Sequence, residues 1–299
     1  MIWETSIKEF SAFLKIEKSL SSNSLDAYIH DVMKVTQFLD YYNYKLGPEE
    51  IKLTHLKEFI EWVNKLGMSP RSQARFISGI KAFYKFLLLD DKIESDPTTL
   101  LETPKIGRKL PVFLSIEEID QLIDAIDLST PEGHRNKAML ETLYSCGLRV
   151  SELTNLKITN LYFNMEFIKV FGKGSKERLV PISKKAIKEI EFYLKYDRNK
   201  IAVKKGSENI VFLNRRGNKL TRVMIFTIIK TLAKKINLEK NIGPHTFRHS
   251  FATHLMDGGA DLRAIQEMLG HESITTTEIY THLDREYLRD AILRFHPRS

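Results

Sequence analysis

The sequence contains almost no cysteine, and this scarcity excludes two kinds of structure. Cys146 is the single cysteine in 299 residues, so an internal disulfide and a cysteine-rich zinc site are both excluded. Long apolar runs are missing as well: the densest one, Phe86–Leu89, ends at Asp90 and is far shorter than the ~18 residues of a membrane span. The first ten residues carry three charged side chains, where a signal peptide would be apolar. We therefore expect a cytoplasmic protein without a membrane segment.

The sequence also lacks a cluster of carboxylates able to hold magnesium, which argues against a nuclease that uses two metal ions. His245 and His249 stand four residues apart, a spacing that also permits a zinc site. The residues between them are Thr-Phe-Arg, without a general-base glutamate, and the charge of Arg248 would repel a metal ion. We therefore expect neither a metal nor another cofactor.

What the sequence has in excess is positive charge, and this charge is unevenly distributed. Residues 1–103 hold 13 Lys and Arg against 15 Asp and Glu, a net charge of −2, whereas residues 104–299 hold 33 against 23, a net charge of +10. A basic C-terminal part points to a polyanion, most often nucleic acid. A solubilising surface has the same composition, so charge alone leaves both interpretations open.

The change in charge coincides with a break in the pattern of the chain. Residues 104–111 contain two prolines, a glycine and three cations without periodicity, which predicts a linker. The apolar spacing of residues 1–103 is typical of helices only. After the linker, helical patterns surround two strand-like runs, 165–171 and 178–182, that predict a hairpin. We expect a mainly α protein with a helical domain 1–103 and a second domain 112–299 that carries a small β-hairpin or sheet, with 210–213 as a further candidate strand.

Helix starts are marked by residues that cap a free helix end. Three of them are predicted in the first domain: one at Asn23 or Ser22, one at Thr54, and one at Ser69, which Pro70 follows. Ser115–Glu118 is a capping box, and Ser151 is a candidate cap for a short helix over 152–157. On the helix after Ser69, the cations that lie opposite the apolar stripe belong either to a solvated face or to a surface for a phosphate backbone. They are Arg71, Arg75 and Lys85.

Four short segments of the second domain carry polar side chains of interest: 147–152, 172–174, 245–250 and 269–280. The residues are Arg149, Lys173, His245, Arg248, His271 and Tyr280. Taken singly, each has an ordinary explanation: Arg149 can pair with Glu152, and Lys173 can be a solvated loop cation. His245 and Arg248 stand three residues apart and so share one helical face.

Taken together, these six side chains suit displacement at a phosphodiester without a metal. The transition state gathers negative charge on the non-bridging oxygens, and a guanidinium group binds two of them at once. A phenol has a pKa near 10 and needs a neighbouring base and cations before it is a good nucleophile. A lysine on a hairpin loop can protonate the leaving alkoxide.

These residues and their surroundings resemble the tyrosine site-specific recombinases. The segments TLYSCGLRVSELTNL, FGKGSKERLVPI, HTFRHSFATHL and LGHESITTTEIYTH match that family in order and spacing. The resemblance covers nearly the whole chain. Within the family, the chain is most similar to the Xer subgroup. The similarity lies in the segment GGADLRAIQEMLGHESITTTEIYTH and in the short tail after the tyrosine.

The resemblance implies a role for each of the six residues. Tyr280 would attack the scissile phosphate, giving a 3′-phosphotyrosyl link and a free 5′-hydroxyl. Arg149, Arg248 and His271 would hold the phosphate oxygens, His245 would assist proton transfer, and Lys173 would protonate the leaving 5′-oxygen. Because the energy of the broken bond stays in the phosphotyrosine, neither ATP nor a metal is implied.

The resemblance also implies how the protein meets its partners. The two domains would close as a C-shaped clamp on double-stranded DNA, with Arg71, Arg75, Lys85 and Lys176 as candidate DNA contacts. A tetramer, homomeric or shared with a sister Xer recombinase, would pass through a Holliday junction and resolve chromosome dimers at a dif-type site, activated by an FtsK-type translocase. Two alternatives stay open: an integrase of a mobile element, and a non-catalytic DNA-binding regulator, against which the intact Tyr280 argues.

The last helix predicted by the sequence covers residues 284–296. Leu288, Ala291 and Ile292 belong to its apolar stripe, and a helix this short must bury that stripe. It packs either on its own domain or, as the resemblance implies, on a neighbouring protomer. We expect the second arrangement, an exchange helix.

Overall fold

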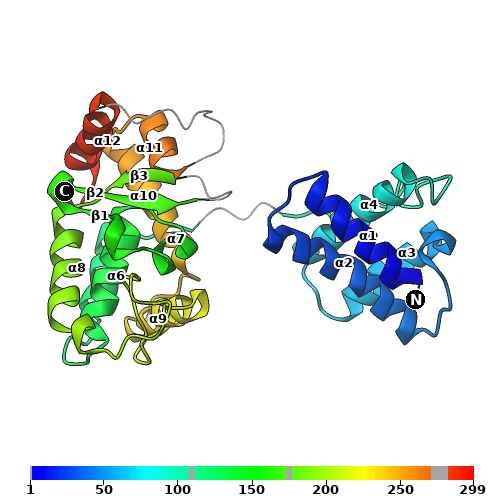
Figure 1. Cartoon of the computed structure of the whole chain (residues 1–299), viewed down its shortest axis with the longest axis horizontal. Helices are drawn as coiled ribbons and strands as arrows, with labels where there is room; N and C mark the ends of the chain where they lie inside the picture. The colour runs from blue at the N-terminus through cyan, green and yellow to red at the C-terminus, as the bar shows by residue number, and fades with distance from the viewer. Residues whose placement is uncertain (1, 108–111, 173–176, 271–281) are drawn as a thin grey trace. The chain divides into compact units, whose positions relative to one another are not determined.

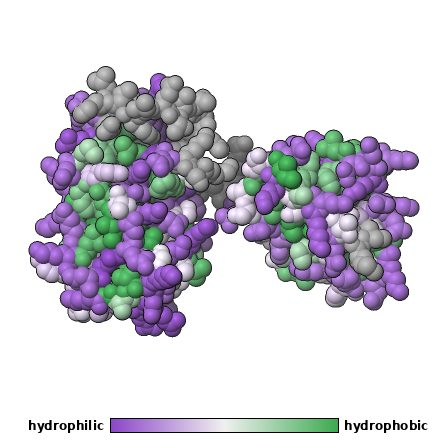
Figure 2. All heavy atoms as spheres, viewed as in Figure 1, coloured by the Kyte–Doolittle hydropathy of each residue, from purple (hydrophilic) through white to green (hydrophobic). Residues whose placement is uncertain are grey.

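The structure is a computed structural model that describes residues 2–107, 112–172, 177–270 and 282–299. It divides into two compact units, Met1–Lys109 and Leu110–Ser299 (Figure 1), and the division falls within residues 104–111. Each unit has its own apolar core. On the face seen in Figure 2, hydrophilic residues cover most of both units and hydrophobic residues are scattered among them. No helix among the described residues has the length and apolar character that crossing a membrane requires.

The described part of the N-terminal unit is helical, as predicted. Its elements are α1 (Ile2–Ile16), α2 (Ser22–Tyr41), the 3-10 turn η1 (Pro48–Glu50), α3 (Leu53–Lys65) and α4 (Pro70–Leu89). Aromatic side chains make up a large part of its core. Phe10 and Phe83 meet edge to face with ring centroids 5.3 Å apart, and Phe38 and Phe59 meet in the same way at 5.7 Å. This geometry is the favoured one for aromatic pairs.

Of the three helix starts predicted in this unit, the one at Ser69 is confirmed and the other two are wrong. The cap of α2 is Ser21 and neither Asn23 nor Ser22, because the Ser21 hydroxyl accepts the backbone N–H of Ser24 at 3.4 Å. Ser69 caps α4: its hydroxyl accepts the backbone N–H of Ser72 at 3.3 Å, and Pro70 is the first helical residue. Thr54 is not a cap, because α3 begins at Leu53. Among the described residues, no side chain caps the first N–H groups of α3; the backbone N–H of Lys52, the residue before the helix, donates to Nδ1 of His55 at 3.1 Å.

The second unit combines helices with one small sheet. Its helices are α5 (Ile116–Asp124), α6 (Gly133–Ser145), α7 (Val150–Thr154), α8 (Lys184–Tyr196), α9 (Arg222–Lys235), α10 (Pro244–Gly258), α11 (Leu262–Leu269) and α12 (His282–Phe295), with 3-10 turns η2 (Ile158–Asn160), η3 (Phe163–Met165) and η5 (Arg198–Lys200). Its strands are β1 (Leu161–Tyr162), β2 (Phe167–Phe171) and β3 (Glu177–Pro181), antiparallel in the order β1-β2-β3. The mainly α fold with a small sheet is therefore confirmed.

The strand predictions are partly right. The predicted hairpin is β2 and β3, with Ile168 opposite Val180. The two-residue strand β1 was not predicted, since it is too short to show alternation. Residues 210–213 are not a strand: they take part only in isolated bridges, Lys157 with Ile210 and Leu213 with Lys219. Their run of apolar residues reflects burial and not a ladder.

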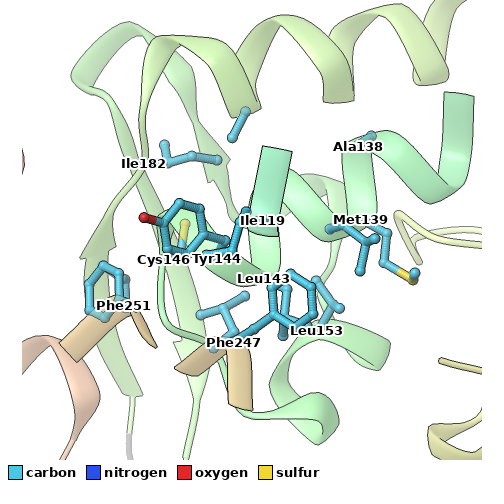
Figure 3. Packing of buried hydrophobic residues seen from close by; sticks show 14 of the residues in the cluster. Ile119, Ala138, Met139, Leu143, Tyr144, Cys146, Leu153, Ile182, Phe247 and Phe251 are labelled. Carbon is cyan, nitrogen blue, oxygen red and sulfur yellow. The ribbon is translucent and has the colours of Figure 1, made fainter. Parts of the chain in front are cut away.

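A single core holds the helices that carry the polar residues of interest. Phe247 and Phe251 of α10 belong to this core together with Leu153 of α7 and Leu143 of α6 (Figure 3), and all four are fully buried. The predicted capping box of α5 is confirmed, with the Ser115 N–H donating to Glu118 at 2.8 Å. Ser151 is not a cap.

The C-terminal helix packs on its own domain in this single chain, and its exchange between protomers stays a prediction. Leu288, Ala291 and Ile292 of α12 are buried in the core of the second unit. The helix lies against α10, α11 and β3 (Figure 1). These elements present an apolar surface within the same chain, and the stripe is buried against it.

Candidate active site

Three arginines and one glutamate meet where α7, β3 and α10 approach the end of α11. Arg149 is the residue immediately before α7, and Glu152 lies in its first turn. Arg178 comes from β3, and Arg248 comes from the second turn of α10. The side chain of Glu152 is 1% exposed and that of Arg178 is 6% exposed, so an ion pair lies at the base of the cluster.

Glu152 uses both carboxylate oxygens. Arg178 donates to Oε1 at 2.7 Å and to Oε2 at 2.9 Å. Arg149 donates its backbone N–H to Oε2 at 2.8 Å and Nη1–H to Oε1 at 3.0 Å. Burial alone would raise the pKa of Glu152, but the hydrogen bonds and charge of Arg178, with those of Arg149, outweigh it and hold the pKa below the usual range. The carboxylate is therefore ionised and fully engaged.

The same three arginines each bind one carbonyl at the C-terminal end of α11. Arg178 donates Nε–H to the carbonyl of Met268 at 2.8 Å, Arg248 donates to that of Leu269, and Arg149 donates to that of Gly270 at 3.1 Å. The last carbonyls of a helix have no partner within it and carry partial negative charge. Cationic donors at this end fix the backbone of the residue that directly precedes His271 in the chain.

Arg248 is buried and strongly held. Its Nη1 donates to the carbonyl of Gly147 at 2.7 Å. Burial, with the nearby charge of Arg149, lowers the pKa of Arg248 to about 10, which leaves the guanidinium protonated at neutral pH. Gly147 has a φ of +55°, and a Cβ there would lie 2.4 Å from Phe251. Glycine is required at this turn for both reasons.

The charges of the cluster do not cancel. One carboxylate faces three guanidinium groups, so the cluster carries a net positive charge. The side chain of Arg149 is 32% exposed, whereas that of Arg248 is 10% exposed. A cluster of guanidinium donors whose position is fixed by Glu152 and by backbone carbonyls is suited to hold the oxygens of a phosphate group.

The structure brings two of the six predicted catalytic residues together, Arg149 and Arg248. His245 is exposed in the first turn of α10, one turn before Arg248. Lys173, His271 and Tyr280 lie outside the described residues, as does Lys176. Among the described residues, no three His, Cys, Asp or Glu side chains are grouped to hold a metal ion.

Sequence reasoning missed two members of the cluster. Glu152 was considered only as the partner of Arg149, and Arg178 was not singled out. The signal for Arg178 was its place in the strand-like run 178–182, where a charged residue precedes apolar ones. The sequence does not show that this charge is buried against Glu152, which stands 26 residues earlier.

The candidate DNA contacts of α4 differ in their surroundings. Arg71 and Lys85 are exposed. Arg75 forms an ion pair with the buried Asp31 of α2 and lies over the ring of Phe76. Burial raises the pKa of Asp31 to about 6 against the lowering effect of Arg75. The charge of Arg75 is therefore largely committed within the domain.

Comparison with known families shows to which family the chain belongs. Residues 112–286 match the Phage integrase family, and residues 7–90 match the Phage integrase, N-terminal SAM-like domain. The chain belongs to the phage integrase family and is a tyrosine recombinase, an enzyme that cuts and rejoins DNA in site-specific recombination.

Relatives within that family indicate the subgroup. The chain is 43% identical to the tyrosine recombinase XerD of Listeria innocua over 293 residues, which covers 98% of this chain and 99% of the relative. It is 43% identical to the tyrosine recombinase XerD of Staphylococcus haemolyticus over 305 residues, covering 99% of this chain and all of the relative.

Solved structures show the same architecture. The XerA recombinase is 31% identical, with a TM-score of 0.50 and coverage of 99% of this chain and 100% of that chain. The XerH recombinase bound to its difH substrate gives a TM-score of 0.67 at 24% identity, covering 87% and 77%. The latter likeness concerns the fold alone.

Proposed function

We propose that this recombinase acts on chromosomal DNA in the cytoplasm and resolves chromosome dimers at a dif-like site. Similarity to XerD proteins over nearly the full chain supports the proposal. The fold is also that of XerH, which was solved on a difH substrate. We further propose a tetramer on DNA, homomeric or with a sister Xer recombinase, activated by an FtsK-type translocase.

The observation that carries the proposed mechanism is the arginine cluster around Glu152. Arg149 and Arg248 have their guanidinium groups fixed before any DNA arrives, so binding a phosphate costs little reorganisation. In the proposed reaction, the hydroxyl oxygen of Tyr280 bonds to the scissile phosphorus and the bond to the 5′-oxygen breaks. The proton of the phenol leaves with help from His245.

The remaining roles follow from the balance of charge and protons. The two arginines and His271 stabilise the charge that grows on the non-bridging oxygens, and Lys173 gives a proton to the 5′-oxygen. The exposed cations Arg71 and Lys85 contact the DNA backbone, as does Lys176. Rejoining reverses these steps when a 5′-hydroxyl from another strand attacks the phosphotyrosine, so no external energy source is needed.

The nucleophile is tested by Tyr280→Phe, which removes the hydroxyl and keeps the ring. On a nicked duplex carrying a dif sequence, the wild-type protein should form a covalent complex that survives a denaturing gel. The variant should bind the same DNA and form none. A covalent complex with Tyr280→Phe would overturn the assignment of the nucleophile.

The chromosomal role needs a separate test. Deleting the gene in its host should cause chains of cells with unsegregated chromosomes, and a plasmid carrying two dif sites should recombine only when the gene is present. Recombination confined to the ends of a mobile element would instead identify an integrase. Binding without any covalent complex would identify a regulator.

A further inference from the structure

Arg178 is the buried member of the arginine cluster, and its surroundings differ from those of the other two. Among the described residues its side chain donates to both oxygens of Glu152, at 2.7 and 2.9 Å, and to the carbonyl of Met268, at 2.8 Å. Its side chain is 6% exposed. The α-carbon of Gly270 lies so close that a Cβ there would be 3.1 Å from Cδ of Arg178. A residue so enclosed does not meet DNA.

The charge of Glu152 explains why an arginine at position 178 matters. A buried carboxylate needs a counter-charge, because an unpaired charge away from water is very costly. Without Arg178, the nearest cations in the part of the chain that the structure describes are Arg149, which contacts Oε1 at 3.0 Å, and Arg248, which is 3.9 Å from Oε2. Either arginine would then be drawn closer to Glu152, and its positive charge would no longer be available to bind a phosphate.

Stability alone does not account for the pair. Replacing a buried ion pair by apolar groups of similar volume is often neutral or stabilising. The bidentate geometry instead fixes the carboxylate in one orientation, and the third hydrogen bond fixes the end of α11. Lysine has no planar fork and cannot make the same three contacts.

We propose that Arg178 is a positioning residue for the recombination reaction. It neutralises Glu152, so that Arg149 and Arg248 keep their charge for the scissile phosphate. It also holds the carbonyl of Met268, three residues before His271. This inference rests on the proposed role of the two outer arginines as phosphate ligands.

The first experiment compares Arg178→Met with a matched control. Arg198 is an arginine of the same unit whose Nε and Nη2 bind the carbonyls of Ile210 and Glu208, away from Glu152, so Arg198→Met removes a structural arginine of equal size. Single-turnover formation of the covalent complex is measured on a nicked dif duplex, together with affinity for that duplex and thermal unfolding. Arg178→Met should cleave about 10²-fold more slowly, the scale of a small misplacement of reacting groups, with unchanged affinity. Arg198→Met should lower stability and keep the cleavage rate.

A double variant tests the charge argument itself. In Arg178→Met combined with Glu152→Gln, no carboxylate remains to draw in Arg149, so the double variant should cleave about tenfold faster than Arg178→Met alone, a coupling typical of directly interacting residues. Arg178→Lys, which keeps the charge, should recover part of the rate.

The outcomes separate this inference from the proposed function. A wild-type protein that forms no covalent complex contradicts both. A wild-type protein that cleaves while Arg178→Met matches the Arg198→Met control contradicts only the role of Arg178. A double variant as slow as Arg178→Met, or slower, overturns the proposal that Arg178 neutralises Glu152 and so keeps the charge of Arg149 and Arg248 for the phosphate.

Discussion

At the scale of single residues, the site depends on guanidinium groups that are charged although they are largely buried. Arg248 is tolerated in this position because two backbone carbonyls, those of Gly147 and Leu269, accept its hydrogen bonds, and because Glu152 lies nearby. Hydrogen bonds to a charged group are stronger than neutral ones. The position of this side chain is therefore fixed by the fold rather than by DNA.

This arrangement predicts different effects on cleavage and on binding. Arg248→Ala and Arg149→Ala should each lower the single-turnover cleavage rate by about 10²-fold, the cost of losing one preorganised donor to a developing charge. Affinity for duplex DNA should change little, since the charge that they meet is largest in the transition state. Arg248→Lys should stay slow, because an ammonium group cannot span two carbonyls and a phosphate. Parallel losses of affinity and rate would make these arginines ordinary phosphate contacts.

The residues of this site could be predicted from the sequence only in part. Arg149 and Arg248 could be predicted because both belong to local patterns. Arg149 stands beside a helix start, and Arg248 follows a histidine by three residues. Arg178 could not be, since its partner Glu152 is 26 residues away and becomes a neighbour only when β3 lies beside α7. Contacts of this kind are determined by tertiary packing, and no local pattern in the sequence predicts them.

At the scale of secondary structure elements, the crossing of α2 and α4 shows how a single glycine sets a distance. Gly79 of α4 is buried, and a Cβ there would lie 2.6 Å from Cβ and Oδ2 of Asp31 in α2. Real side chains do not approach this closely, so any larger residue must push the two helices apart. The pair of Asp31 and Arg75 lies at this crossing.

Gly79→Ala should therefore destabilise the N-terminal unit. Overpacking of a core typically costs about 1–3 kcal/mol, and the better helix propensity of alanine recovers at most about 1 kcal/mol. Gly107→Ala is the matched control, because nothing lies within 4 Å of a Cβ at that position. Urea unfolding followed by circular dichroism measures both variants. Equal stability of the two would show that the helices can separate without cost.

The tail after α12 is a second element whose packing has a measurable consequence. His296 is 2% exposed and packs on the rings of Tyr144 and Phe251, and its Nδ1 accepts the backbone N–H of Arg298 at 3.0 Å. Arg298 in turn pairs with Glu141 of α6 at 3.2 Å. These contacts anchor the end of the chain in its own domain.

The pKa of His296 gives this anchor a pH dependence. Burial, with the charge of Arg298 as a further cause, lowers this pKa from 6.5 to about 3. Between these two pH values the unfolded chain binds a proton that the folded protein does not bind. The contribution of His296 to stability is therefore complete above pH 6.5 and falls as the pH drops toward 3. In this range the free energy of unfolding changes by about 1.4 kcal/mol per pH unit for one proton. His296→Phe should remove this part of the slope in urea unfolding between pH 7.5 and 5, and an unchanged slope would contradict the assignment.

The helices and the hairpin were predictable because periodicity and caps act locally. The structure confirms the helical N-terminal unit, the cap at Ser69 and the hairpin of β2 and β3. The caps predicted at Thr54 and at Ser151 failed, and the strand predicted at 210–213 failed because its partners lie elsewhere in the chain. The apolar run 210–213 is buried without joining a sheet, and α12 finds its surface on α10, α11 and β3. An apolar stripe predicts that a helix is buried, but it does not say against what.

At the scale of the whole molecule, charge is divided between the two parts of the chain. The first 103 residues carry a net charge of −2 and the remainder carries +10. Duplex DNA attracts the second part through its phosphates, and each phosphate that a cation neutralises releases counterions. The first part can contribute only through cations that are free of partners within the domain. Among the candidate DNA contacts on α4 these are Arg71 and Lys85, whereas Arg75 is paired with Asp31.

This distinction predicts how salt affects DNA binding. The plot of log affinity against log salt concentration should become shallower by about 1 for each of Arg71→Ala and Lys85→Ala, the effect of losing one phosphate contact. Arg75→Ala should leave the slope nearly unchanged and should instead lower the stability of the N-terminal unit, because Asp31 would be left buried without its partner. Fluorescence anisotropy on a labelled duplex at several salt concentrations, with thermal unfolding of the same variants, measures both effects. If Arg75→Ala flattens the slope as much as the other two, its guanidinium leaves Asp31 when DNA binds, and the ion pair of the free protein is broken in the complex.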